Sequence, residues 1–236
     1  MKSNKNNTMD EDADIIPIDL GPVKAFLIRG EKNFLVDAGN PGDAEDILDE
    51  VMKEGVEPDD IDSIIITHVH PDHAGSLHEL KEKTRARVVV HEKEAENIAR
   101  GDFLDAPPTC LKGRILSFFL SIFGSGESKG TEPDILVGER FDLSELGING
   151  SVVHTPGHTP GSISVVLDSG EALVGDLVMG GLLLSSSKPN RPIFAYDLEG
   201  AERSLKRLLK GDVKIRKFYG AHGGPFPRDK IVDLVG

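Results

Sequence analysis

Three histidines and an aspartate lie within six consecutive positions of the stretch THVHPDHAGS at residues 67–76. Imidazole nitrogens and carboxylate oxygens are groups with which proteins bind zinc and related ions. In an extended backbone, residues two apart project to the same side, so we expect His68 and His70 to converge on one ion. Asp72 and His73 follow one step further, where we expect them to serve a second, adjacent ion.

The alternative for any single histidine here is a polar loop residue or a helix cap, which is the usual role of an isolated histidine. Four such residues together are harder to explain in that way. At this chain's histidine frequency, the pattern H-x-H-x-D-H is expected by chance in roughly one chain per thousand of this size. The pattern therefore favours a metal site, while it leaves the metal and the reaction open.

A metal site needs more ligands than one loop supplies, so further ligands are expected at the ends of other strand-like runs. VVHTPGHTPGS contains His154 and His158, ALVGDLVMGG contains Asp176, and FYGAHGGP contains His222. All three stretches have an apolar run followed by glycine, which would present a side chain from a rigid strand end. His78 and His91 fit surface or helix-end positions instead.

The elements that must position these residues alternate in the first half of the chain, as in an α/β protein. The helix at 42–55 has Ile47, Leu48, Val51 and Met52 on one apolar stripe. A strand at 61–68 runs directly into the histidine loop. The sequence predicts the other elements at 15–20, 23–30 and 33–39 (strands), at 74–84 (helix) and at 86–100 (strand then helix).

The second half is richer in short strands, followed by a helix at about 197–211, a strand at 217–222 and a short terminal helix. We assign its strands to 135–138, 140–143, 150–155, 161–168 and 171–176. Two mixed halves of this kind predict two sheets packed face to face, with helices on the outer faces. We interpret residues 1–13 as a disordered polar leader and residues 14–236 as a single domain.

An apolar, lid-like insertion interrupts this pattern at about 102–134, between Pro-Pro and a stretch rich in glycine and serine. Leu111, Ile115, Phe118, Phe119 and Ile122 fit one helical face, and the opposite side is apolar as well. Such a helix needs cover on both sides, from the core, a partner subunit or an apolar substrate. A homodimer through this insertion is therefore one of the expectations.

Composition narrows the partners and the compartment. The 236 residues carry a formal net charge of -13, which repels nucleic acid and anionic lipid. The longest apolar run, at 115–124, is far shorter than the roughly 20 residues of a transmembrane helix. A single cysteine and the polar first residues, without a secretory signal, favour a cytoplasmic protein. We expect a small-molecule substrate.

The motifs THVHPDH, TPGHTPGS, VGDLVMGG and YGAHGG, in this order, resemble those of the metallo-β-lactamase-fold hydrolases. The resemblance spans residues 14–234 and lies in the broad branch that includes glyoxalase II-type thioesterases. It implies an α/β protein with a four-layer αββα sandwich and a site at one edge of the two sheets. It also implies the metal ligands: His68, His70 and His158 on one ion, Asp72, His73 and His222 on the other, and Asp176 bridging both.

The resemblance further implies two divalent ions, most readily Zn2+, with iron or manganese as alternatives. Two ions about 3.5–4 Å apart can share a hydroxide at neutral pH and polarise a carbonyl oxygen. Asp72 would then orient this nucleophile or manage its proton. Asp37 resembles an acidic position that supports metal-binding histidines through hydrogen bonds, and His154 would serve behind the ligands.

We therefore predict a hydrolase that acts on an ester, thioester or lactone carbonyl of a small, partly apolar substrate. Phe118, Phe119, Ile122 and Met179 would line the approach to the metals. Met179 stands where N-acyl-homoserine lactonases have a tyrosine, which argues against that activity. The alternatives are a mononuclear iron oxidoreductase resembling persulfide dioxygenases, a phosphodiesterase on the same ligands, and a ligand-binding module with a structural metal.

Overall fold

The computed structural model describes residues 14–114, 129–180 and 188–236. The polar leader at 1–13 lies outside the described residues. So does the central part of the insertion, with Phe118, Phe119 and Ile122.

The first six-stranded sheet has the order β1-β2-β3-β4-β5-β6. Its first three strands form an antiparallel meander, and β3 to β6 run parallel. The strands are β1 (Asp14–Asp19), β2 (Lys24–Arg29), β3 (Asn33–Val36), β4 (Ile61–Ile65), β5 (Arg87–His91) and β6 (Ile135–Val137). The helices between them are α1 (Ala44–Lys53), α2 (Pro71–Ala74), α3 (Leu77–Thr84) and α4 (Ala95–Arg100), with the 3-10 turns η1 (Pro58–Asp60) and η2 (Glu92–Glu94).

The second six-stranded sheet has the order β12-β11-β10-β9-β8-β7. All its neighbours are antiparallel except β10 and β11. Its strands are β7 (Arg140–Asp142), β8 (Gly150–His154), β9 (Ile163–Leu167), β10 (Glu171–Leu173), β11 (Lys217–Tyr219) and β12 (Phe226–Pro227). Helices α6 (Leu198–Leu209) and α7 (Arg228–Val235) and the turns η3 (Leu143–Leu146) and η4 (Gly175–Leu177) complete this half.

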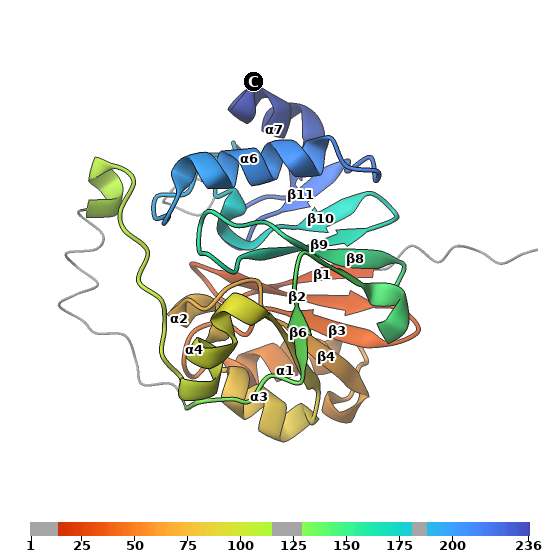
Figure 1. Cartoon of the computed structure of the whole chain (residues 1–236). Coiled ribbons are helices and arrows are strands. Elements are labelled where there is room, and N and C mark those ends of the chain that lie inside the picture. Colours follow the sequence, from red (N-terminus) through yellow and green to blue (C-terminus); the bar gives the residue numbers. More distant parts are fainter. Residues whose placement is uncertain (1–13, 115–128, 181–187) are drawn as a thin grey trace, which may run out of the picture.

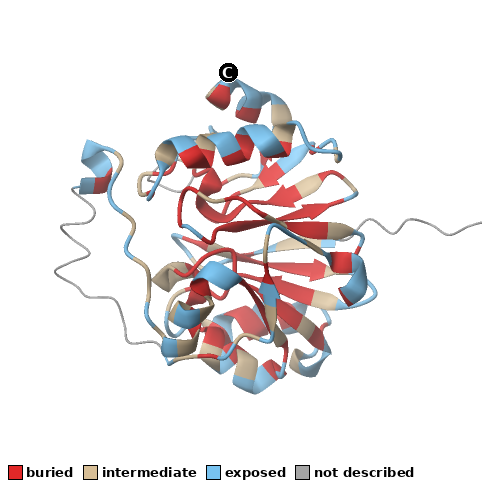
Figure 2. Cartoon of the chain, in the orientation of Figure 1, coloured by how far each residue is buried: buried red, intermediate tan, exposed pale blue. Residues whose placement is uncertain are grey.

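The two sheets pack face to face, with α1, α3 and α4 outside the first and α6 and α7 outside the second (Figure 1). This arrangement confirms the predicted four-layer αββα sandwich. Strand β2 illustrates the pattern that builds it, because side chains alternate between the faces of a strand. Phe26 and Ile28 belong to the core between the sheets, whereas Ala25 and Leu27 pack toward the helices. Buried residues accordingly run through both sheets and the inner helix faces (Figure 2).

Two details of the sequence interpretation are wrong. It groups the strand at 135–138 with the second half, but β6 lies at the edge of the first sheet, parallel to β5. There it satisfies the open hydrogen-bonding edge of β5, a long-range pairing that no local pattern encodes. It also places Met52 on the apolar stripe of its helix, but Met52 is 43% exposed, while its neighbour Val51 is buried. Met52 lies at the margin of a stripe that Ile47, Leu48 and Val51 already fill.

Two further observations concern the surface of the molecule. Among residues 14–114, 129–180 and 188–236, no helix is long and apolar enough to cross a membrane. At the start of the insertion, residues 111–114 are helical and Leu111 is 70% exposed.

Candidate metal centre

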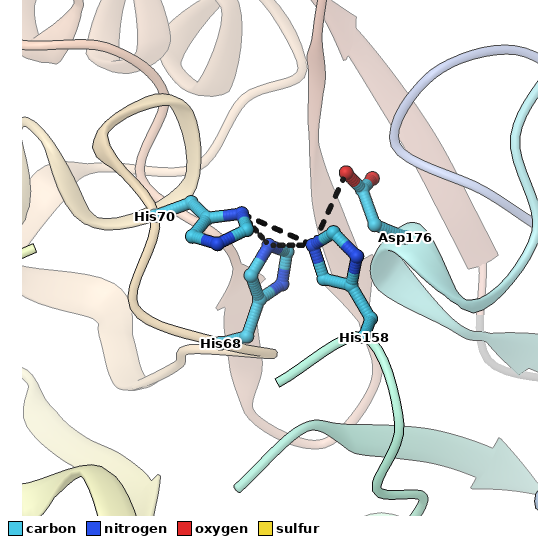
Figure 3. A group of neighbouring side chains, drawn as sticks. All are labelled: His68, His70, His158 and Asp176. Atoms are coloured by element: carbon cyan, nitrogen blue, oxygen red, sulfur yellow. Dashed lines mark hydrogen bonds and ion pairs between the residues drawn. The ribbon is translucent and has the colours of Figure 1, made fainter. Parts of the chain in front are cut away.

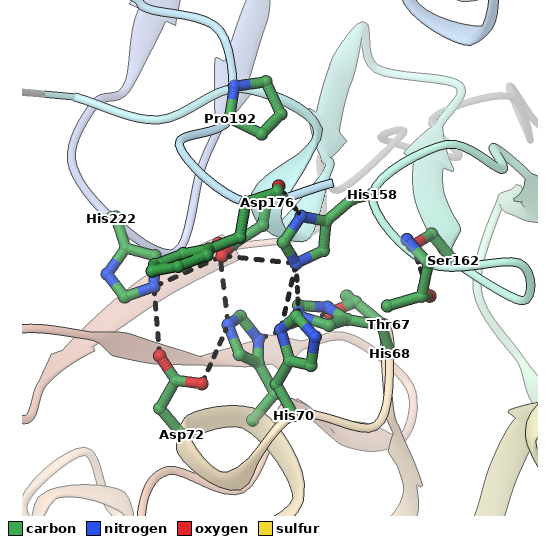
Figure 4. Close-up of polar contacts among 12 residues, drawn as sticks. Thr67, His68, His70, Asp72, His158, Ser162, Asp176, Pro192 and His222 are labelled. Atoms are coloured by element: carbon green, nitrogen blue, oxygen red, sulfur yellow. Dashed lines mark hydrogen bonds and ion pairs between the residues drawn. The ribbon is translucent and has the colours of Figure 1, made fainter. Parts of the chain in front are cut away.

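All seven predicted ligands follow the ends of strands and meet at one place. Strand β4 leads into the loop that carries His68 and His70, and α2 begins at Pro71, so Asp72 and His73 belong to its single turn. His158 follows β8. Asp176 lies in η4 after β10, and His222 follows β11. Four separate stretches of the chain thereby bring together the residues that the sequence predicted as ligands (Figures 3 and 4).

The first ligand group consists of His68, His70, His158 and Asp176, whose side chains point toward one another (Figure 3). Three nitrogens form a triangle: His68 Nε2, His70 Nδ1 and His158 Nε2 lie 3.0 Å from one another. A tetrahedral ion with bonds of about 2.0–2.1 Å holds its ligand nitrogens about 3.3 Å apart. The triangle is therefore close to the size that a zinc-like ion requires.

The second ligand group consists of Asp72, His73 and His222. His222 Nε2 lies 3.1 Å from Asp72 Oδ2, and His73 Nε2 lies 3.9 Å from Asp72 Oδ1. Asp176 faces both groups, because its Oδ2 is 3.6 Å from His158 Nε2 and 3.4 Å from His222 Nε2. In Figure 4, Asp176 stands between His158 and His222. A carboxylate in this position is suited to bridge two ions.

The site fits a metal because it contains buried polar atoms that lack a hydrogen-bond partner. Among the described residues, buried side-chain atoms without a hydrogen-bond partner include His73 Nε2 and Asp176 Oδ1. These two atoms face each other across 3.5 Å. Such unpaired polar atoms are costly in a protein interior, so each requires an explanation. An ion accepting both as ligands supplies that explanation, and the histidine and carboxylate donors suit zinc.

Burial keeps the imidazoles of the first group neutral. His68 and His158 are each 1% exposed, and burial lowers the pKa of both. Burial and the nearby His158 lower the pKa of His70 to about 3. A neutral imidazole has a lone pair to offer to an ion. These three residues are therefore in the ligating form without the loss of a proton.

The second group has the opposite charge state, because acidic residues surround its histidines. Burial alone would lower the pKa of His73, but Asp37, Asp72 and Asp176 outweigh burial and raise it well above its ordinary value. For His222, burial is likewise outweighed by Asp176 and Asp72, which raise the pKa to about 10. The pKa of Asp176 is lowered well below its ordinary value, since His222 and His73 overcome the effect of its burial.

Hydrogen bonds on the outer sides of the imidazoles aim them at the centre. His158 Nδ1 donates to the carbonyl of Phe194 at 2.8 Å, and His222 Nδ1 donates to the carbonyl of Pro22 at 2.7 Å. A proton on Nδ1 that is held in this way turns Nε2, the atom that would bind an ion, toward the site. His68 has the same orientation, with its Nδ1 3.1 Å from the Thr67 hydroxyl.

Asp37 occupies the supporting position that the family resemblance implied. Its Oδ2 lies 2.8 Å from His73 Nδ1, and its Oδ1 accepts hydrogen bonds from the backbone and the hydroxyl of Thr67. Asp37 is buried, and its backbone has a φ of 65°, in the left-handed region that few residues other than glycine adopt. Thr67, which the sequence interpretation missed, joins this carboxylate to His68.

Two other predicted positions, His154 and Met179, have the following surroundings. The hydrogen-bond partners of His154 are Glu139 and the carbonyl of Pro160, and its ring stacks on His91 at a centroid distance of 3.9 Å. None of these partners is a candidate ligand. Met179 follows η4 with 9% of its surface exposed, and its backbone pairs with Asn190.

The start of the insertion lies against the segment that holds His158. Thr109 donates from its backbone to the carbonyl of Ile193 at 2.8 Å and from its hydroxyl to the carbonyl of Pro192 at 2.7 Å. The backbone of Ala195 donates to the carbonyl of Pro107. These bonds flank Phe194, the residue whose carbonyl accepts from His158. The insertion is thus attached directly beside the first ligand group.

A buried glutamate near the ligands was also missed by the sequence interpretation. Glu94 is 1% exposed and accepts hydrogen bonds from the two loops that carry His68, His70 and His158. Its sequence neighbourhood, EKEAE at 92–96, contains three glutamates. No local signal separates the buried one from the other two, because burial depends on how distant loops pack.

Comparison with known proteins agrees with this geometry. The family model described as the metallo-β-lactamase superfamily matches residues 18–221. The chain is 27% identical to "Probable metallo-hydrolase MJ0888" of Methanocaldococcus jannaschii, over 84% of this chain and 86% of that protein. It is 30% identical to "Probable metallo-hydrolase YflN" of Bacillus subtilis, over 74% of this chain and 69% of that protein.

A solved structure is similar along nearly the whole chain. The metallo-β-lactamase family protein TTHA1429 of Thermus thermophilus superposes with a TM-score of 0.65. Its sequence is 25% identical, and the match covers 95% of this chain and 78% of that one.

Proposed function

The chain belongs to the metallo-β-lactamase superfamily, and from this premise we propose that it is a hydrolase with two divalent ions, most readily Zn2+. Its reaction would be the attack of water on the carbonyl of an ester, thioester or lactone. Membership of the superfamily and the His/Asp clusters support a metallo-hydrolase in general. The number and kind of ions, the bond cleaved and the glyoxalase II-like branch are our proposals.

The observation that carries this proposal is the position of Asp176 between the two ligand groups. Its carboxylate is 5% exposed and lies within 3.6 Å of nitrogens from both groups. A single structural ion would need only one closed group of four ligands. A buried carboxylate that is shared by a second, partly exposed group favours a pair of ions and therefore a reacting centre.

The protein residues would bind and orient, and the ions would supply the activation. Two bound ions lower the pKa of a shared water and polarise a carbonyl oxygen. Asp72 is suited to orient that water or to accept its proton, because its side chain is 32% exposed. Its contact with His222 Nε2, at 3.1 Å, fixes the direction of the carboxylate.

The proposed substrate is small and partly apolar. The insertion is attached beside His158 through Thr109, and Met179 follows the η4 turn that carries Asp176. Apolar groups at these positions would favour an acyl portion of the substrate over a phosphate. The net charge of -13 also disfavours polyanionic substrates.

The test combines metal content with a substrate panel. Protein purified without added metal is measured by elemental analysis and then assayed with acyl thioesters, lactones and phosphodiesters. We expect about two zinc ions per chain and turnover of at least one acyl class. The matched control is Asp176→Asn, which keeps the size of the side chain and should lose the activity.

Two outcomes would overturn this proposal. Phosphodiester turnover together with inactivity on every acyl substrate would identify a phosphodiesterase. One iron per chain with consumption of oxygen would identify an oxidoreductase that resembles the persulfide dioxygenases.

Compartment and assembly belong to the same proposal. We propose a cytoplasmic enzyme, because the single cysteine, Cys110, is exposed and unpaired in a chain with no second cysteine. A homodimer through the insertion is the corresponding proposal for assembly. Its central residues lie outside the described part of the chain, so sedimentation or light scattering of the intact protein is the suitable measurement.

A further inference from the structure

Glu94 is a buried carboxylate between two loops that carry candidate ligands. It lies at the end of η2, where the chain enters α4, and it is 1% exposed. Burying a carboxylate is unfavourable unless hydrogen bonds compensate for the lost water. Burial indeed raises the pKa of Glu94, although its hydrogen-bond donors oppose this effect. The hydrogen bonds that Glu94 accepts therefore indicate what this buried carboxylate does.

One oxygen of Glu94 binds the first loop. Its Oε2 accepts a hydrogen bond from the backbone N–H of Val69 at 2.7 Å. Val69 is the residue between His68 and His70, whose inward nitrogens are 3.0 Å apart. The bond therefore restrains the backbone that sets the relative position of these two imidazoles.

The other oxygen binds the second loop. Its Oε1 accepts from the hydroxyl of Thr159 and, at 2.8 Å, from the backbone N–H of Gly161. Thr159 directly follows His158. The two loops are far apart in sequence, yet the nitrogens they contribute lie 3.0 Å apart in the first ligand group. Glu94 is a side chain that joins both loops at once.

We propose that Glu94 is a positioning residue that holds His68, His70 and His158 at the separation required by an ion in the first ligand group. This inference rests on the proposed function, because it assumes that the group binds a metal. Glu94 would do for the first group what Asp37 does for the second, where the carboxylate contacts His73 directly. It differs from Asp37 in acting through the backbone on either side of the ligands.

The glycine at position 161 supports this role independently. A Cβ atom at Gly161 would lie 2.7 Å from Glu94 Cγ and 2.9 Å from its Oε1. Such contacts are too short, so any side chain at position 161 would displace the carboxylate. The absence of a side chain there is what allows Glu94 to reach both loops.

The test measures the affinity of each ligand group separately. In a His222→Ala background the first group keeps all its histidines, and in a His158→Ala background the second group does. Metal-free protein is titrated with Zn2+ by calorimetry and with Co2+ by visible absorption, which reports the geometry of the ligands. Glu94→Gln leaves at least one donor unpaired, because its amide nitrogen cannot accept a hydrogen bond.

We expect Glu94→Gln to weaken binding about 10- to 100-fold in the His222→Ala background, the usual effect of removing an outer hydrogen bond from a metal site. Binding in the His158→Ala background should stay unchanged. Gly161→Ala, which keeps the charge but displaces the carboxylate, should reproduce the effect and provides the test if Glu94→Gln fails to fold. Asp37→Asn should instead weaken binding in the His158→Ala background, because the Asp37 carboxylate contacts His73.

Asp134→Asn is the matched control, because Asp134 also accepts a backbone hydrogen bond, from Val88, but contacts no ligand loop. It should leave both zinc affinities unchanged. Equal weakening in both backgrounds, or no weakening in the first, would show that Glu94 has a general structural role and overturn the inference. Failure of the unsubstituted protein to bind zinc at all would instead refute the proposed function, and this inference with it.

Discussion

The two ligand groups use the same kinds of side chain in opposite environments. In the first group, His68 and His158 are almost fully buried and the pKa values of all three histidines are lowered. In the second, His222 and Asp72 are half-buried and neighbouring carboxylates raise the pKa of both histidines. If both groups bind ions as proposed, this difference predicts that the first group retains its ion and that the second exchanges protons and meets the substrate.

The supporting residues differ in the same way. Asp37 places a negative charge directly against His73. The outer partners of the first group are neutral or remote: the Phe194 carbonyl contacts His158, and the Glu94 carboxylate contacts backbone rather than imidazole. A charged partner makes an imidazole more basic, whereas a carbonyl orients it with a smaller effect. The support from Asp37 thus contributes to the raised pKa of His73, whereas the raised pKa of His222 comes from the candidate ligands Asp176 and Asp72.

The most severe way to break this contrast is to change Asp176, the carboxylate that both groups share. We expect Asp176→Asn to lower kcat/KM roughly a thousandfold, because it removes several kcal/mol of stabilisation from both ions. Zinc affinity should fall in both groups, as measured in the His222→Ala and His158→Ala backgrounds. The exposed Asp168→Asn, on the turn after β9, is the matched control. Loss of affinity in one group alone would argue against a shared ligand.

The pH dependence of zinc binding should sharpen the contrast with a somewhat smaller effect. Because the pKa values of His73 and His222 are raised, both hold a proton at pH 7 that an ion must displace, so binding to the second group strengthens as pH rises. Two displaced protons correspond to about a hundredfold per pH unit.

Binding to the first group should change little between about pH 6.5 and 8, because the lowered pKa values leave its histidines neutral throughout. Calorimetry at several pH values, in buffers of different ionisation enthalpy, counts the protons released in each step. An equal number in the two steps would contradict the assignment of charge states.

The smallest expected effect concerns how fast each ion leaves. The ion in the first group should resist a chelator roughly ten times longer than the ion in the second, because a buried shell limits access of solvent. Elemental analysis during dialysis of the zinc-loaded protein gives both rates. The variants His222→Ala and His158→Ala show which ligand group each rate belongs to. Equal rates of zinc loss from the two groups would contradict the distinction between a retained and an exchangeable ion.

The convergence of the candidate ligands could be predicted from the sequence because each stands in a short motif that follows a strand. The stretch at 67–76 contains four of them, and the order of the four motifs implied the others and the αββα sandwich. What escaped prediction depends on distant parts of the chain. Strand β6 pairs with β5 across the insertion, and the role of Glu94 emerges only when the loops of Val69 and Thr159 meet around it.

Met52 shows that apolar periodicity alone does not predict which residues of a helix are buried. Its position satisfies the spacing of an apolar stripe, but periodicity does not say how wide the covered face is. The residues of α1 that reach the core are Ala44, Ile47, Leu48 and Val51. Conversely, no sequence pattern identifies Thr67 as a supporting residue, since a threonine before a histidine is common. Its role follows from the hydrogen bonds that it makes to Asp37.

The left-handed backbone of Asp37 limits which mutations a lineage of this protein can accept at that position. Glycine would adopt a φ of 65° easily but would remove the carboxylate that His73 requires. Glutamate would keep the charge, yet longer side chains seldom occupy this region, whereas aspartate and asparagine do. Aspartate combines a side chain that tolerates this backbone conformation with a carboxylate for His73. Most substitutions at position 37 would therefore lose one of these two properties.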